Sequence, residues 1–378
     1  MKIMHLSDLH LGKMVNEYSM IDDQKYILNE ILHIAKDQKP DVIIMAGDIY
    51  DRSVPPAEAV QLLDDFLTEL SASHFPVLII SGNHDSAERV SFGSRLMESS
   101  GIHIAPVYNG TVEPITMEDE YGPVHFYLLP FVKPAHVRRY YPDDEIKDYT
   151  DAMRCAISHM TLDPQQRNIM VTHQFVGGAQ RSDSEDLSVG GTDNVDPSVF
   201  DSFDYVALGH LHGPQSAGRE TIRYCGTPLK YSFSELTHQK SVTLIEMKEK
   251  GNISLNTIPL IPLHDMKEIR GTFNELTDPS YYTSLDRKDY YHVFLTDEQD
   301  IPNAMNRLRV IYENIMLLDY DNLRTRTNNK IEKISEIEKK SPLDIFEEFY
   351  KLQNGQSFNE QQKEIIQTMM EEIWEDKK

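Results

Sequence analysis

The chain has 378 residues, of which 40% are apolar and 26% charged, and its formal net charge is −24. This composition fits a folded globular protein, and the acidic total argues against one that holds DNA through a simple basic patch. A nucleic-acid substrate would therefore require bound cations, a local basic surface or a partner. Cys155 and Cys225 are too few for a disulfide scaffold or a cysteine zinc cage. With no membrane-length apolar run and an early polar start, these features predict a cytoplasmic protein.

Short apolar runs alternate with amphipathic stretches over the first two thirds, a pattern of layered α/β or α+β folds. A helix with apolar residues from Ile27 to Ala35 is expected to end before Pro40, and Pro55-Pro56 is expected to open a second helix. We expect a two-sheet β-sandwich flanked by helices, with its strand order left open. The expected strands, the last three in hairpins, cover residues 2–7, 41–46, 76–80, 124–129, 168–172, 205–208, 222–224, 242–247 and 253–258.

The sequence changes character near residues 262–265. Strands at 266–270, 291–296 and 315–319 and a helix at 301–312 predict a small second domain. We therefore expect a main domain at 1–262, a small α+β capping domain at 263–326, and a linker with a helical tail at 327–378. The two amphipathic tail helices need a cover for their apolar faces, and the pattern leaves open whether this chain or a partner's helices provide it.

Residues that can bind metal follow the predicted strands. Since the carboxyl ends of such strands meet at one rim of a layered fold, we expect these segments to converge. Carboxylate oxygen and imidazole nitrogen together suit a borderline divalent metal such as Mn, Fe or Zn. The segments are Asp8-Leu9-His10, Gly47 to Asp51, Gly82 to Asp85, His173, and Gly209 to His212.

The spacing inside these segments sharpens the prediction. In extended Asp-x-His or His-x-His, the two side chains point to the same face and can grip one ion. The Asp48 carboxylate can bridge two cations, and two cations about 3.5–4 Å apart can clamp a phosphate and lower the pKa of a water. Each segment alone is more often a turn, a surface feature or a core histidine. All five in this order predict a phosphoesterase with hydroxide as nucleophile.

This ordered set resembles the calcineurin-like metallophosphoesterase superfamily, a two-sheet β-sandwich around a dinuclear centre. Segments 1–12, 47–52, 82–89 and 341–350 resemble, more narrowly, the SbcD family of bacterial nuclease subunits, and the resemblance covers essentially the full chain. It implies a 3′-to-5′ exonuclease on double-stranded ends and an endonuclease on single strands or hairpins. It also implies action with an SbcC-type coiled-coil ATPase in DNA repair, recombination and replication, tail helices that bind this ATPase, and a nucleoid-associated homodimer within a heterotetramer.

The resemblance also assigns roles to individual residues. It places one metal on Asp8, His10 and His212, the other on Asn83, His173 and His210, and Asp48 between them, with His84 as the catalytic histidine. The two ions are expected to be Mn²⁺, with Mg²⁺, Fe²⁺ and Zn²⁺ as alternatives. Three further residues are candidates on the substrate side. Asp51 stands where archaeal and eukaryotic relatives have a second histidine. Asp85 either orients His84 or caps the next helix, and Arg89 either contacts a phosphate or forms a surface salt bridge.

Several interpretations stay open from the sequence. The polar stretch 177–196 is either a solvated loop or a gate over the site, and Lys133, His136, Arg138 and Arg139 form a solvated cluster or a contact for the DNA backbone. The rival functions are another phosphoesterase of the same superfamily, namely a protein phosphatase or a cyclic-nucleotide phosphodiesterase, and a non-catalytic adaptor for a coiled-coil ATPase. The chain has no Gly-x-x-x-x-Gly-Lys-Ser/Thr segment, so ATP use is expected of the partner.

Overall fold

The computed structural model describes residues 1–182, 185, 193–322 and seven isolated positions after residue 345. The chain divides into two compact units, one formed by residues 1–269, 277–293 and 303–318, the other by residues 270–276, 294–302 and 319–378. The three-part division expected from the sequence stays a prediction, and the linker and tail helices lie outside the described residues apart from those seven positions. Within the described ranges, no helix combines the length and apolar character needed to cross a bilayer.

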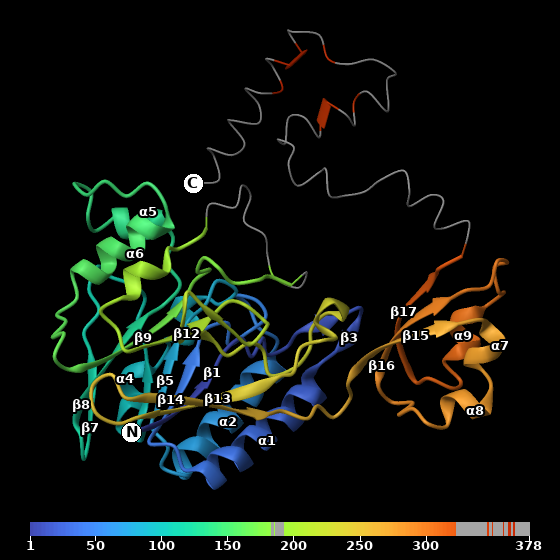
Figure 1. Cartoon of the computed structure of the whole chain (residues 1–378), viewed down its shortest axis with the longest axis horizontal. Coiled ribbons are helices and arrows are strands. Elements are labelled where there is room, and N and C mark those ends of the chain that lie inside the picture. The colour runs from blue at the N-terminus through green and yellow to red at the C-terminus, as the bar shows by residue number, and fades with distance from the viewer. Residues whose placement is uncertain are drawn as a thin grey trace. The chain divides into compact units, whose positions relative to one another are not determined.

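Two six-stranded sheets form the core of the first unit (Figure 1). In order across the sheet, the first consists of β14 (Ile253–Pro259), β13 (Ser241–Met247), β1 (Lys2–Leu6), β4 (Val42–Ala46), β5 (Val77–Ile80) and β6 (Ile102–Ile104). The second consists of β11 (Gln215–Ala217), β12 (Arg219–Tyr224), β10 (Tyr205–Gly209), β9 (Arg167–His173), β8 (Gly122–Leu129) and β7 (Ile115–Asp119). The predicted β-sandwich is thus confirmed.

Parallel pairing dominates the centre of both sheets. β1, β4 and β5 run parallel in the first sheet, and β8, β9, β10 and β12 run parallel in the second. Every residue of β4 is buried, because Ile44 packs between the sheets while Ile43 and Met45 pack in the cluster that includes the helices. Strands covered on both faces read as continuous apolar runs, which is why the sequence revealed them.

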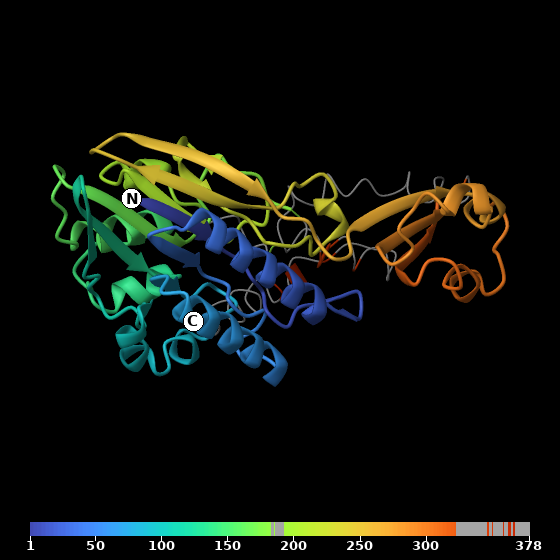
Figure 2. The ribbon, with the colours of Figure 1, turned by 90° about the horizontal axis from the view of Figure 1, so that it is seen from below.

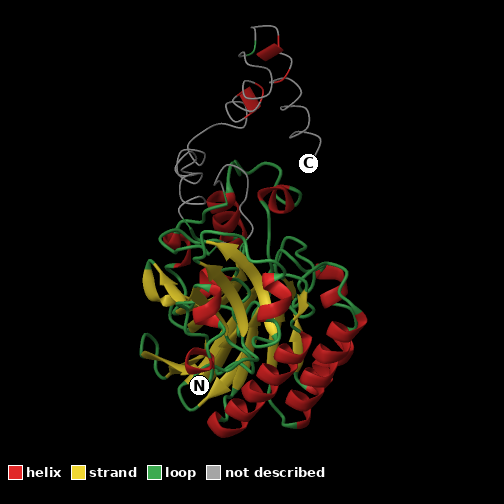
Figure 3. Cartoon of the chain, turned by 90° about the vertical axis from the view of Figure 1, so that its right-hand side faces the viewer, coloured by secondary structure: helices red, strands yellow, loops and turns green. Residues whose placement is uncertain are grey.

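Helices cover the outer faces of the two sheets, as seen from below in Figure 2 and by element type in Figure 3. α1 (Ile21–Gln38) and α2 (Ala57–Ala72) lie side by side and pack with the first sheet, and α5 (Pro134–Arg138) and α6 (Tyr149–Ser158) pack with the second. α1 ends where Lys39 adopts a left-handed conformation before Pro40. α6 was not predicted, and Asp148 caps it by accepting a hydrogen bond from the Asp151 N–H.

The remaining elements lie outside the two large sheets and their four covering helices. A three-stranded sheet has the order β15 (Met266–Gly271), β16 (Tyr290–Leu295), β17 (Asn314–Tyr320), and a two-stranded one pairs β2 (Met14–Val15) with β3 (Tyr18–Ser19). The short α-helices are α3 (Ala87–Val90), α4 (Ser94–Met97), α7 (Phe273–Leu276), α8 (Pro279–Tyr282) and α9 (Ala304–Leu308). The 3₁₀ turns are η1 (Glu98–Ser100), η2 (Pro197–Phe200) and η3 (Phe233–Glu235).

The predicted hairpin strands are confirmed: β12 pairs antiparallel with β11 in the second sheet, and β13 pairs antiparallel with β14 in the first. One helix prediction differs from the structure. The helix predicted at 301–312 is only α9. Its end follows from a shared acceptor: the N–H groups of Ile311 and Tyr312 both donate to the carbonyl of Leu308, which tightens the chain into a turn before β17.

Candidate metal centre

The segments that follow the central strands are joined by backbone hydrogen bonds at one end of the sandwich. The N–H of Asp8 donates to the carbonyl of Gly47 over 3.0 Å, and the N–H of His10 donates to the carbonyl of Asp48 over 2.9 Å. The N–H of His210, from the second sheet, donates to Oδ1 of Asp8 over 2.9 Å. Segments separated by up to 202 positions in sequence are therefore held together.

Backbone strain is concentrated here. Asp8, His10, Asp48 and His210 all have positive φ, at 53°, 45°, 48° and 108°. A left-handed conformation costs roughly 1–2 kcal/mol for a residue with a Cβ, so the surrounding contacts must maintain it. The positive φ angles bend the backbone sharply at these residues, so that their side chains point toward the same small volume.

Two glycines allow the sheets to approach each other at the centre. A Cβ on Gly47, whose φ is +88°, would collide with the ring of His173, and a Cβ on Gly209 would collide with the carbonyl of Ala46. Nδ1 of His173 donates to that same Ala46 carbonyl over 2.9 Å, which fixes the ring so that Nε2 faces the other site residues. Only glycine permits this packing of backbone against a histidine ring.

The Asp48 carboxylate lies in the middle of the candidate ligands. Its Oδ2 is 3.2 Å from Nε2 of His173 and 3.7 Å from Nε2 of His10. Oδ1 of Asn83 is 3.0 Å from Nε2 of His173 and 2.8 Å from Nδ1 of His210. Asp48 belongs to two trios whose donor atoms lie within 4.8 Å of one another, one with Asp8 and His173 and one with His10 and His84. The Asp48 carboxylate thus belongs to both candidate metal sites.

The seventh predicted ligand, His212, is held by two glutamates. Its ring centroid lies 5.1 Å from that of His10. Its Nδ1 is 3.1 Å from Oε1 of Glu235, whose other oxygen accepts from Nζ of Lys240, and its N–H donates to Oε1 of Glu185 over 2.6 Å. Burial opposes the charged Glu235 carboxylate, but His212 and Lys240 outweigh burial and lower its pKa. Sequence reasoning missed both glutamates, since neither lies in a motif.

His84 is positioned through the backbone around it. Its N–H donates to Oδ1 of Asp48 over 2.9 Å, and its Nδ1 lies 3.1 Å from the carbonyl oxygen of Asp51, which can only accept. Nδ1 therefore carries the proton, and Nε2 lies 4.0 Å from Oδ2 of Asp48. The carboxylate of Asp51 instead accepts from Nζ of Lys13 over 2.7 Å and is 3.7 Å from Nδ1 of His10.

Asp85 and Arg89 make their contacts with backbone groups. The Asp85 carboxylate accepts three backbone hydrogen bonds of 2.9–3.0 Å, from the N–H groups of Ile49, Tyr50 and Gly82. It thereby ties the Asp48 segment to the Asn83 segment, and burial together with Asp48 raises its pKa to about 6. The Arg89 guanidinium donates to the carbonyl of Ser53 over 2.9 Å.

The electrostatics of the centre favour a cation. Burial raises the pKa of Asp8 to about 6, lowers that of His10 well below its usual range and lowers that of His210 to about 3. Burial also disfavours protonated His173, but the Asp48 carboxylate outweighs burial and raises the pKa of His173 to about 9. The deprotonated imidazoles of His10 and His210 lie beside the buried carboxylates of Asp8 and Asp48, an arrangement that positive charge stabilises.

The residues present fit divalent metal ions. Oδ2 of Asp8 and both ring nitrogens of His10 are buried without a hydrogen-bond partner among the described residues. Buried polar atoms normally have a hydrogen-bond or metal partner, so these three atoms indicate a site for a bound group. The donor set of carboxylate, amide and imidazole, without thiolate, suits Mn²⁺, Fe²⁺ or Zn²⁺. The identity of the metal and the division of the seven ligands between two ions stay predictions.

Two family models match the chain, and together they cover the metal centre and the C-terminal region. The model described as calcineurin-like phosphoesterase matches residues 1–214, which include every candidate ligand. A second model, described as type 5 capsule protein repressor C-terminal domain and named SbcD_C, matches residues 262–354.

Individual relatives match over the whole chain. A Staphylococcus epidermidis protein, named as the SbcD subunit of the SbcCD nuclease, is 33% identical over 98% of both chains. Its namesake from Staphylococcus saprophyticus is 34% identical over 100% of this chain and 99% of its own. Among solved structures, a dimetal phosphatase from Danio rerio covers 68% of this chain and 95% of its own with 11% identity and a TM-score of 0.41.

Proposed function

Because the chain belongs to the calcineurin-like phosphoesterases and, within them, to the SbcD family of nuclease subunits, we propose that it is the nuclease subunit of an ATP-dependent complex. In this proposal it hydrolyses DNA phosphodiesters, as a 3′-to-5′ exonuclease on double-stranded ends and as an endonuclease on single strands and hairpins. It serves DNA repair, recombination and replication in the cytoplasm, at the nucleoid. The main support is the convergence of donor side chains from five segments around Asp48.

Two divalent cations, Mn²⁺ first among them, are the proposed cofactors. Asp8, His10 and His212 would hold one and Asn83, His173 and His210 the other, with Asp48 between them. When bound, the cations supply the positive charge that activates a water and offsets the negative charge of the phosphodiester.

His84 is the proposed acid for the leaving 3′ oxygen. Its Nδ1 proton is engaged by the carbonyl of Asp51, so the proton given to substrate must come from Nε2, on the side of Asp48. The ring therefore starts as imidazolium and ends neutral, with Nδ1–H unchanged. A fixed Nδ1 contact keeps Nε2 aimed in one direction through this cycle.

The proposed partners are DNA, an SbcC-type coiled-coil ATPase and a second copy of this chain. A partner that binds nucleic acid offsets the net charge of −24. The match of residues 262–354 to the SbcD_C model supports ATPase binding through the C-terminal region. Leu96 lies on the short helix α4 and Phe92 lies just before it, and each side chain is 82% exposed. These exposed apolar side chains support a contact between two copies.

A substrate comparison tests the proposed function. Purified full-length protein loaded with Mn²⁺ is given end-labelled linear duplex DNA or a phosphopeptide, each with and without the ATPase and ATP. We expect DNA cleavage that the ATPase and ATP enhance, and none by Asp48→Ala, which removes the carboxylate shared by both trios. Phosphopeptide hydrolysis with intact DNA would instead identify a phosphatase, and equal DNA cleavage by Asp48→Ala would support an adaptor without its own activity. Metal analysis of the same samples measures occupancy.

A further inference from the structure

A cavity of about 470 Å³, here called the side cavity, opens beside the metal centre. Asn83, a predicted metal ligand, lines it. So do Lys133, His136, Arg139 and Tyr140, which lie on and beside α5 and are here called the wall. The size of the cavity lies within the range of small-molecule and nucleotide sites. Because Asn83 belongs to both, the cavity adjoins the metal centre.

The structure selects two cations from the basic cluster found in the sequence. The guanidinium of Arg138 donates to the carbonyl of Ile146 over 3.0 Å, and Arg138 does not line the cavity. Nδ1 of His136 accepts a hydrogen bond of 3.3 Å from the N–H of Lys133. Lys133 and Arg139 are exposed side chains that line the cavity, and they are the cations that face its solvent.

The carboxylates of the lining are engaged elsewhere. Both oxygens of Asp85 accept backbone hydrogen bonds, as described above, and Oε2 of Glu88 accepts from the hydroxyl of Ser86 over 3.0 Å. Lys133 and Arg139 offset the charges of these two carboxylates, so the lining is formally balanced on a chain whose total charge is strongly negative.

Aromatic rings connect the metal centre to the same wall. The ring of Phe131, which lines the cavity, meets that of His173 edge to face with 6.3 Å between centroids. Tyr140 packs edge to face on Tyr108 with 5.8 Å between centroids, and the Arg139 guanidinium carbon lies 5.9 Å from the centre of the Tyr140 ring. An aromatic face beside a guanidinium is a surface on which bases of single strands stack.

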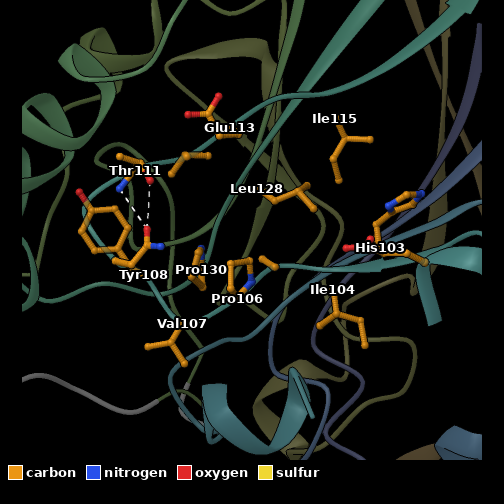
Figure 4. Close-up of a pocket in the computed structure, with 14 residues that line it drawn as sticks. His103, Ile104, Pro106, Val107, Tyr108, Thr111, Glu113, Ile115, Leu128 and Pro130 are labelled. Atoms are coloured by element: carbon orange, nitrogen blue, oxygen red, sulfur yellow. Dashed lines mark hydrogen bonds between the residues drawn. The ribbon is translucent and has the colours of Figure 1, made fainter. Parts of the chain in front are cut away.

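A neighbouring cavity provides an internal contrast. It measures about 360 Å³ and shares Val107, Tyr108 and Pro130 with the side cavity; Figure 4 shows Tyr108 at the opposite end from His103. Its lining contains Glu98 and Glu113 and, among the described residues that form it, neither lysine nor arginine. The side cavity has two cations in its lining that this cavity lacks, a difference that favours the side cavity for a nucleic-acid backbone.

We propose that the side cavity binds the nucleotide adjoining the scissile phosphate on a single-stranded DNA segment, with Lys133 and Arg139 on its phosphate and Tyr140 against its base. This inference rests on the proposed function, since it names how that substrate is held. Single strands fit because their bases are free to leave the stack and lie on an aromatic ring.

The test separates substrate holding from chemistry. Full-length Lys133→Ala/Arg139→Ala protein is compared with wild type on a single-stranded oligothymidylate and on bis(p-nitrophenyl) phosphate, a diester too small to reach the wall. We expect kcat/KM for the oligonucleotide to fall about tenfold or more, with the small diester hydrolysed at the wild-type rate. Arg154→Ala is the matched control, because Arg154 pairs with Asp151 on α6 and does not line the cavity.

Binding in EDTA, followed by fluorescence anisotropy across salt concentrations, measures the contacts without cleavage. The double variant should lower the slope of log K against log salt by about 0.7, the contribution of one neutralised phosphate on a single strand, since both cations are assigned to the same phosphate. Tyr140→Ala should weaken binding and Tyr140→Phe should not. An unchanged slope, or equal losses on both substrates, would overturn the inference. Wild-type protein that binds the oligonucleotide with the expected slope yet never cleaves DNA would refute the proposed function instead.

Discussion

The Nδ1–H of His84 donates a hydrogen bond to the main-chain carbonyl of Asp51, while the side chain of Asp51 forms an ion pair with Lys13. Residue 51 thus positions the proposed catalytic histidine through an atom that every amino acid possesses. The side chain at this position can differ without changing the orientation of the His84 ring. The sequence singled out the Asp51 carboxylate, whereas the structure assigns the contact with the histidine to its backbone.

This relationship predicts different outcomes for two substitutions. His84→Gln should lower kcat for DNA cleavage by about 10²–10⁴, because the proton donor is lost while the ring is not among the assigned ligands. Asp51→Asn should retain activity within about tenfold, because the carbonyl remains. Steady-state kinetics together with metal content check both, and a loss for Asp51→Asn as large as that for His84→Gln would contradict the role of the backbone.

Glu235 should control metal affinity through His212. Glu235→Gln removes the charge beside Nδ1 of His212 and should weaken metal binding by about 10–100-fold, which calorimetric titration of metal-free protein measures. The substitution also leaves Lys240 buried without its carboxylate partner, which destabilises the fold. Glu235→Gln/Lys240→Met removes that charge, so this variant should regain thermal stability while its metal affinity stays low. Wild-type affinity in the double variant would rule out the positioning role.

Alanine substitutions at Gly47 and Gly251 can be compared to measure how much the packing at the metal centre depends on the absence of a side chain. Both have positive φ, +88° and +81°, but a Cβ on Gly47 meets the His173 ring whereas one on Gly251 meets nothing within 4 Å. Gly251→Ala should therefore cost only about 1–2 kcal/mol of backbone strain. Gly47→Ala should cost more and abolish metal binding as well, which thermal denaturation and metal analysis will reveal. Equal behaviour of the two variants would show that the ring contact is unimportant.

His5 should make the fold sensitive to acid. It is fully buried between the sheets beside Tyr205, and burial, helped by Arg223, lowers its pKa to about 3 from 6.5. Below pH 6.5 the unfolded chain binds a proton here that the folded chain does not. The free energy of unfolding therefore falls by about 1.4 kcal/mol per pH unit as pH drops from 6.5 toward 3. Above pH 6.5 this contribution is constant.

The corresponding measurement compares slopes. The midpoint of thermal unfolding of metal-free protein is followed from pH 7.5 to 4.5 for wild type and for His5→Gln. We expect the midpoint of the variant to fall less steeply below pH 6.5, whatever its absolute stability. Parallel curves would show that His5 does not cause the acid sensitivity.

The fold was predictable where local pattern is decisive. The central strands are continuous apolar runs because both faces are covered, and α1 and α2 carry apolar stripes at helical spacing. The strand order was left open, because it depends on distant packing: β12 joins the second sheet through β10. The predicted extent of the helix at 301–312 was wrong, since α9 covers only Ala304–Leu308 and the N–H groups of Ile311 and Tyr312 share the carbonyl of Leu308 in the turn that follows.

At the site, the sequence by itself determined which candidate ligands are present and that each lies at or just after the end of a strand, because residue type and strand periodicity are local properties. Only the tertiary structure showed that Glu235 holds His212, that Asp85 ties two loops together, and that Lys133 and Arg139, not Arg138, face the side cavity. These relationships join atoms from separate segments. Their geometry follows from how the two sheets and their loops pack, which no stretch of neighbouring residues encodes.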